Sequence, residues 1–149
     1  MAQTNEPLLS VKGLKQYFPV SKKFTVRAVD NISFDIYPGE TYGLVGESGS
    51  GKSTTGRSII RLYDPTEGTI LFNGEDISKK LTAKQEKMLR SDMQMVFQDP
   101  MASLNPRKKV LDTIALGLDA HHPHMDPKER VERVSKMMEM VGLNPAYMN

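Results

Sequence analysis

Short runs of apolar and β-favouring residues mark predicted strands in the first two thirds of the chain. Residues 32–36 alternate strictly between apolar and polar, which fits a strand with one buried face. Turn-forming residues separate these runs, as Pro38 and Gly39 do before residue 41 and Asn73 and Gly74 do after residue 72. The runs that predict strands are Leu8–Phe18, Phe24–Ile36, Thr41–Val45, Thr69–Phe72 and Asp92–Phe97.

Helical patterns lie between the later strands and dominate after residue 109. The clearest helix start is Asp126, which can cap the helix, with Pro127 at the first helical position and Glu129 completing a capping box. One apolar stripe follows it, at Val131, Val134, Met138 and Val141, and Gly142 ends the helix. The other predicted helices are Lys52–Leu62, Leu81–Arg90 and Val110–Leu118. The order predicts an α/β core over residues 1–99 and a helical segment over residues 100–149.

A glycine-rich segment between a predicted strand and a predicted helix is typical of phosphate binding. It fits G-x-x-x-x-G-K-[ST], with Gly46, Gly51, Lys52 and Ser53 at the fixed positions. Backbone N–H groups at a helix N-terminus form a nest for anions, the lysine reaches the β- and γ-phosphates, and the serine hydroxyl can ligate Mg²⁺. The alternative is a flexible loop whose lysine is merely solvated. The candidate nucleotide-binding residues are Gly46, Glu47, Ser48, Gly49, Ser50, Gly51, Lys52, Ser53 and Thr54.

Composition narrows the class of protein without naming a function. Hydrophobic residues make up 38% and charged residues 26%, as in ordinary globular proteins, and 149 residues suit one domain or part of one. A formal charge of +2 gives no argument for nucleic acid, and no such partner is expected. The chain has no cysteine, so cysteine-based metal sites are excluded. The spacing of His121, His122 and His124 predicts a polar connection between helices rather than a metal site.

Three features together resemble the ATP-binding subunit of ABC transporters over essentially the whole chain. They are the phosphate-binding loop, the segment 96–100 (Val-Phe-Gln-Asp-Pro), which is similar to the family's Q-loop, and an aromatic residue upstream of the phosphate-binding loop. The resemblance implies a P-loop NTPase of the ABC ATPase type, with a mixed sheet around the phosphate-loop helix and the start of a helical subdomain. It also implies that ATP and Mg²⁺ are the cofactors.

The resemblance assigns further roles residue by residue. Gln98 would be the Q-loop glutamine, which coordinates Mg²⁺ beside Ser53 or orients the attacking water. The alternative is that Gln98 is simply an exposed amide at the end of a strand. The adenine-stacking aromatic would be Phe18, with Tyr17 as the close alternative, although either side chain could simply belong to the core. Stacking needs only an exposed π-face.

Residues 98–107 and 14–20 are similar to the wording of the oligopeptide and dipeptide importer branch of the family. The resemblance implies an ATPase at the cytoplasmic face of the membrane that powers peptide import. Its expected partners are membrane-spanning subunits, a second ATPase subunit and, indirectly, an extracytoplasmic solute-binding protein. Nickel or other solute importers remain alternatives, and so does another P-loop NTPase or kinase.

Several family motifs do not occur in this sequence. It contains no strand of four apolar residues followed by Asp-Glu, no Leu-Ser-Gly-Gly-Gln signature, and no histidine after a catalytic strand. The chain resembles the N-terminal half of a domain that stops before its signature. We therefore expect nucleotide binding with negligible hydrolysis by this chain alone, which leaves an inactive nucleotide-binding fragment as an alternative. We also expect exposed apolar surface, an unpaired strand edge and marginal stability.

Overall fold

The computed structural model describes residues 6–98 and 104–148, and it divides the chain into two compact units. The first unit covers residues 1–95 and contains every strand of the described chain together with two helices. The second covers residues 96–149 and is helical in its described part. The division falls close to the boundary near residue 100 that the sequence pattern predicts.

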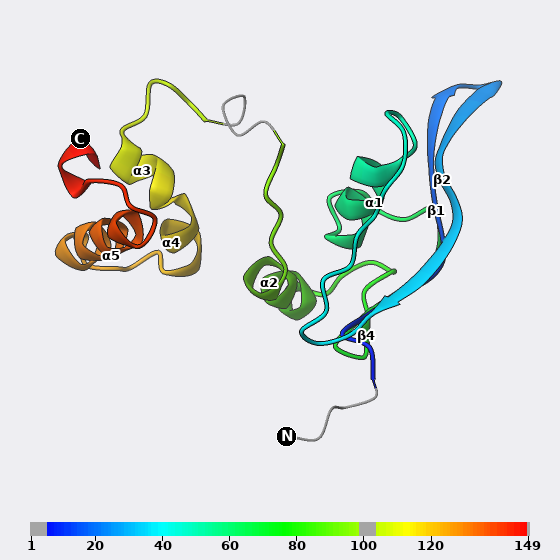
Figure 1. Ribbon diagram of the computed structural model, residues 1–149, viewed down its shortest axis with the longest axis horizontal. Helices are drawn as coiled ribbons and strands as arrows, with labels where there is room; N and C mark the ends of the chain where they lie inside the picture. The colour runs from blue at the N-terminus through cyan, green and yellow to red at the C-terminus, as the bar shows by residue number, and fades with distance from the viewer. Residues whose placement is uncertain (1–5, 99–103, 149) are drawn as a thin grey trace. The chain divides into compact units, whose positions relative to one another are not determined.

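An antiparallel four-stranded sheet, ordered β2-β1-β3-β4, forms the frame of the first unit. β1 (Leu9–Ser21) and β2 (Phe24–Ile36) make a long hairpin, as Figure 1 shows, with Leu9 opposite Ile36 at its base. β3 (Glu67–Phe72) pairs with the other edge of β1, and the turn at Asn73 and Gly74 leads into the short β4 (Glu75–Asp76).

The core of the first unit lies where β1 and β3 meet the helices. α1 (Lys52–Ile59) and α2 (Ala83–Asp92) follow the predicted helical segments, although α1 ends three residues early. α2 starts with a complete capping box between Thr82 and Gln85. The buried apolar residues are Leu9, Val11, Leu14, Val29, Ile70, Phe72, Ile77 and Leu89.

Two of the predicted strands are not formed. Residues 41–45 and 93–97 have no strand partner in the part of the chain that the structure describes. Val45 is 91% exposed and Val96 95% exposed. Both runs are largely apolar and end in at least two consecutive apolar residues, as is typical of strands buried on both faces of a parallel sheet. Such strands form only with neighbours on each side. The described sheet is therefore antiparallel throughout, where the sequence predicted a mixed one.

The second unit packs short helices against one longer helix. The predicted helix at 110–118 is split into α3 (Val110–Ile114) and α4 (Leu116–His121), which meet at the buried Ala115. α5 (Pro127–Met140) buries Val134 and Met138, and a 3₁₀ turn (Pro145–Met148) closes the cluster. The buried apolar stripe of this helix is narrower than the sequence predicts, because Val131 and Val141 are exposed.

Candidate functional site

The glycine-rich loop runs directly into the N-terminus of α1. Residues 41–50 are all exposed, and the helix begins at Lys52. A turn within the loop is closed by the Ser50 amide, which donates to the Glu47 carbonyl at 3.2 Å. The arrangement is the loop-then-helix that the motif requires, although the segment leading into it is extended without a strand partner.

The Lys52 side chain folds back over the loop. Its Nζ atom donates to the carbonyl oxygens of Gly46 at 2.9 Å and Glu47 at 2.6 Å, and to Ser50 Oγ at 3.3 Å. The ammonium therefore lies at the centre of the loop, where an anion enclosed by the loop would meet it. These contacts also hold the loop closed around the lysine.

Gly51 lies where the loop touches the sheet. Its φ is +91°, and a Cβ atom built there would come within 2.2 Å of the Ala28 carbonyl oxygen on β2. Only glycine fits both the left-handed backbone and this approach. The contact fixes the start of α1 against the hairpin.

The first turn of α1 leaves amide groups available to a ligand. The Thr55 amide donates to the Gly51 carbonyl at 2.8 Å, so the amides of Lys52, Ser53 and Thr54 precede the first intrahelical bond. Amides at a helix N-terminus, together with a lysine ammonium, form a positive environment that suits phosphate oxygens. The exposed Ser53 hydroxyl offers an oxygen ligand of the kind that Mg²⁺ takes.

The middle of α1 is held to β1 by a buried polar contact. Ser58 Oγ lies 3.1 Å from the side-chain oxygen of Gln16, and both residues are less than 5% exposed. Ser58 Oγ also lies 2.9 Å from the Thr54 carbonyl. Sequence reasoning missed this pair, because a polar residue in an apolar pattern gives no sign of its partner.

Tyr17 and Phe18 lie in different surroundings on β1. The ring of Phe18 meets Tyr63, in the segment after α1, edge-on with centroids 5.3 Å apart. The Tyr17 hydroxyl donates to Asp30 at 2.5 Å, and the Arg27 guanidinium lies over its ring at 5.4 Å. This hydrogen bond to Asp30 raises the pKa of Tyr17 above its usual value. The Phe18 ring thus contacts a side chain of the segment that follows α1, whereas Tyr17 reaches that segment only through its backbone amide, which donates to Thr66 Oγ1 at 2.9 Å.

A comparison with protein families decides what this chain is related to. The family model described as "ABC transporter" matches residues 29–148, which is most of the chain. The chain belongs to the ABC transporter family. Its α/β fold class is the one that the sequence resemblance predicts.

Curated relatives of this ABC protein carry peptide-transport names. It is 57% identical over 144 residues to the oligopeptide transport ATP-binding protein OppF of Bacillus subtilis, covering 97% of this chain and 47% of the relative. It is 47% identical over 143 residues to the dipeptide transport ATP-binding protein DppF of Lactococcus lactis, covering 95% of this chain and 46% of the relative. This ABC chain spans about half the length of the curated relatives it matches.

Solved ABC cassettes share the fold. The chain is similar to the dimeric structure of the ATP-binding cassette MJ0796 bound to ADP and Pi, with a TM-score of 0.80 and 26% identity, over 95% of this chain and 60% of that one. It is also similar to cbiO1 from Clostridium perfringens, with a TM-score of 0.68 and 27% identity, over 93% of this chain and 52% of that one. The predicted P-loop NTPase fold of the ABC type is confirmed.

The predicted Q-loop, residues 96–100, lies at the boundary of the described residues. Gln98 is exposed and belongs to the second unit, whereas Ser53 and Lys52 belong to the first. Asp99 and Pro100 of this segment lie outside the described residues. The predicted role of Gln98 with Mg²⁺ therefore stays a prediction.

The histidines lie where helices α4 and α5 are joined. His121 ends α4, His122 follows it, and all three histidines, His124 included, are exposed. Within residues 6–98 and 104–148, no group of three or more His, Asp or Glu side chains is arranged to hold a metal ion. None of the described helices is both long and apolar enough to cross a membrane.

Proposed function

We propose that this chain is the nucleotide-binding part of an ABC ATPase and that residues 46–54 bind the phosphates of ATP. The observation that carries the proposal is the placement of the Lys52 ammonium, within 2.9 Å of two loop carbonyls and beside the free amides of the first turn of α1. Bound phosphate oxygens would take over the lysine contacts that the loop carbonyls now accept.

The residues of the loop fit both cofactors. The amides of residues 48–54 and Lys52 would hold the phosphates, with Gly46, Gly49 and Gly51 allowing close approach, and the Ser53 hydroxyl would hold Mg²⁺ together with Gln98. Mg²⁺ held there would supply positive charge that offsets the charge of the phosphates. Glu47, Ser48 and Ser50 complete the loop, and Thr54 adds a contact to the α-phosphate.

Phe18 is our choice for the residue that stacks on adenine. The contact of its ring with Tyr63, in the segment that follows α1, supports it over Tyr17. Tyr17 is engaged on both its hydroxyl and its ring, by Asp30 and Arg27. Stacking on an aromatic face contributes about 1–3 kcal/mol per base.

In the whole protein, we propose that ATP hydrolysis powers the import of peptides. The names of the relatives support this substrate class, and the dimeric state of the MJ0796 cassette supports a second ATPase subunit as a partner. Membrane-spanning subunits and an extracytoplasmic solute-binding protein would complete the transporter, with this chain at the cytoplasmic face of the membrane. Gln98 would orient the attacking water or report the nucleotide state to those subunits.

Binding of MgATP to the parent chain and to Lys52→Ala tests the phosphate site. We expect calorimetry to show at least about tenfold weaker binding by the variant, which corresponds to 1.4 kcal/mol. Lys22→Ala, an exposed lysine in the turn of the β1–β2 hairpin, is the matched control and should bind as the parent does. Equal binding by the parent and Lys52→Ala, with both folded by circular dichroism, would contradict the assignment.

A further inference from the structure

The C-terminal end of α1 has an arginine where helices usually have glycine. The Leu62 amide donates to the Arg57 carbonyl at 2.9 Å and the Arg61 amide to the Ser58 carbonyl at 3.1 Å, which is the Schellman pattern of helix ends. Arg61 takes the left-handed position of this motif, with a φ of +60°. α5 ends with the same pair of bonds, but there Gly142 takes that position, with a φ of +77°.

The arginine at this position is unfavourable for the backbone. The other described non-glycine residues with positive φ are Asn31 and Asn73, and asparagine tolerates this region far better than a long side chain does. The Arg61 side chain is also only 4% exposed, so a charge has been taken out of water. Contacts of the guanidinium must offset both costs.

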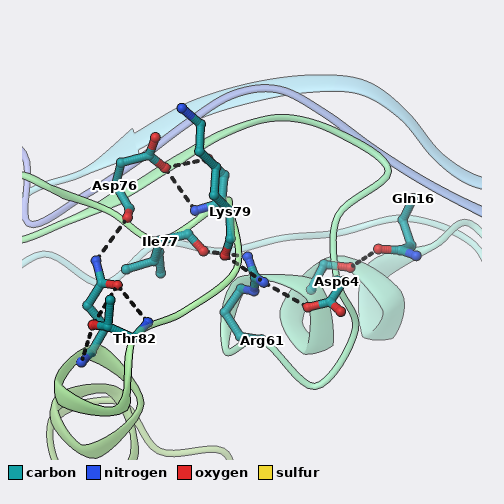
Figure 2. A network of polar contacts seen from close by, with 10 residues as sticks. Gln16, Arg61, Asp64, Asp76, Ile77, Lys79 and Thr82 are labelled. Atoms are coloured by element: carbon teal, nitrogen blue, oxygen red, sulfur yellow. Dashed lines mark hydrogen bonds and ion pairs between the residues drawn. The ribbon is translucent and has the colours of Figure 1, made fainter.

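Those contacts reach the main chain between β4 and α2, as Figure 2 shows. Nη1 donates to the Ile77 carbonyl, and Nη2 donates to the Lys79 carbonyl at 3.1 Å and to the Asp64 carboxylate at 2.7 Å. The Nε atom is buried with no acceptor among the described residues. Carbonyl acceptors on a neighbouring segment make the side chain a tether between two elements.

The segment that receives the tether is itself fixed. Ile77 is fully buried in the core of the first unit. The Asp76 carboxylate accepts from the Ser78 amide at 2.9 Å, and the Asp76 carbonyl accepts from Gln85 at 3.2 Å. Gln85 in turn forms the capping box with Thr82 at the start of α2.

We propose that Arg61 is a positioning residue for the phosphate site: its guanidinium ties the C-terminal end of α1 to the main chain at Ile77–Lys79, and so fixes the helix whose N-terminus receives the phosphates. The inference rests on the proposed nucleotide binding. Gly51 against β2 holds one end of α1, the Ser58–Gln16 contact holds its middle, and Arg61 holds its other end.

The variant Arg61→Gly separates the tethering role of the guanidinium from the role of residue 61 in ending the helix. Glycine suits the left-handed backbone and keeps the Schellman bonds, so only the tether is lost. In the full chain without nucleotide, we expect the amides of Thr55–Ile60 to exchange hydrogen about tenfold faster. At 10 °C, with the protein folded, we expect the Kd for MgATP to rise about three- to tenfold. Asp64→Ala is the matched control and should change neither, because Asp64 is 91% exposed.

Two results would overturn the inference. Unchanged exchange in α1 with Arg61→Gly would show that the guanidinium does not hold the helix. Faster exchange with an unchanged Kd would show that the tether serves stability alone. If the parent chain fails to bind MgATP, the proposed function is wrong and the phosphate-site role falls with it, while the exchange measurement, which needs no ligand, still decides whether Arg61 holds α1.

Discussion

Gly51 shows how a single residue links the phosphate-binding loop to the sheet. The motif requires glycine here, and the structure adds a second reason, since the Ala28 carbonyl occupies the space that a Cβ atom would need. Loop conformation and helix placement therefore depend on the same residue. A substitution at Gly51 should change both stability and the site.

We expect Gly51→Ala to lower the free energy of unfolding by about 2–4 kcal/mol, from the left-handed backbone and the steric overlap together. Gly49→Ala is the matched control in the same loop: its φ is +79°, but no atom lies within 4 Å of its Cβ position. It should cost only about 1–2 kcal/mol. Urea denaturation of the three proteins measures the difference, and equal losses would show that the Ala28 contact relaxes freely.

At the scale of elements, helix ends were the most predictable feature of the sequence, and even they were only partly so. The cap at Asp126 is confirmed, since its carboxylate accepts from the Lys128 amide at 2.8 Å. The Glu129 half of the predicted capping box has no counterpart in the described contacts, where Glu129 instead pairs with Arg133 at 2.7 Å. A capping residue acts on its own backbone, whereas a longer side chain chooses among several partners.

Asp126→Ala should lower the free energy of unfolding by about 1 kcal/mol, the usual cost of losing an N-cap. Glu129→Ala is the control and should cost less, because it removes only an exposed ion pair. Thermal unfolding followed by far-ultraviolet circular dichroism measures both. A larger loss in Glu129→Ala would mean that its side chain caps the helix in solution.

The helices of the second unit are joined by Arg130, which sequence reasoning missed. Its guanidinium donates to the Asp119 carboxylate at 2.8 and 2.9 Å and to Asp112 at 3.1 Å. The hydrogen bond with Arg130 holds the pKa of Asp119 below its ordinary value. The stabilisation is therefore present above the ordinary carboxyl pKa and is lost as the pH falls through the lowered one.

We accordingly expect the stability of the parent chain to fall below about pH 4 by more than that of Arg130→Met, whose Asp119 has no such partner. Urea denaturation at pH 7, 4 and 2.5 measures the two slopes. Asp119→Asn at pH 7 should have a free energy of unfolding similar to that of the parent chain in acid. Parallel pH profiles for the parent and Arg130→Met would contradict the coupling.

At the scale of the whole molecule, the family and most of the element order could be predicted from the sequence. The pairing of the strands in the sheet could not be predicted from it. The apolar patterns at 41–45 and 93–97 predict strands, but a strand needs a partner, and local pattern says nothing of where the partner lies. The contacts of Arg61, Arg130 and Gln16 were also beyond prediction, because each joins residues distant in sequence.

The unpaired segment at 41–45 should be cleaved by chymotrypsin earlier than the paired β1–β2 hairpin. Tyr42 is 44% exposed and its backbone belongs to no ladder, whereas the backbone of Tyr17 is paired within the hairpin. Limited digestion followed by mass spectrometry should therefore show cleavage after Tyr42 before cleavage after Tyr17. The reverse order would mean that residues 41–45 are protected in solution.

The edge-on contact of Phe18 with Tyr63 bears on the fluorescence of the chain. The chain has no tryptophan and five tyrosines, so its ultraviolet emission comes from tyrosine alone. Tyr63 lies with its ring centroid 5.3 Å from that of Phe18. A base that stacks on Phe18 would change the surroundings of Tyr63. A tryptophan placed at position 18 would be the single tryptophan of the chain. Stacking of adenine on Phe18, as proposed, would therefore change the tyrosine emission of the chain.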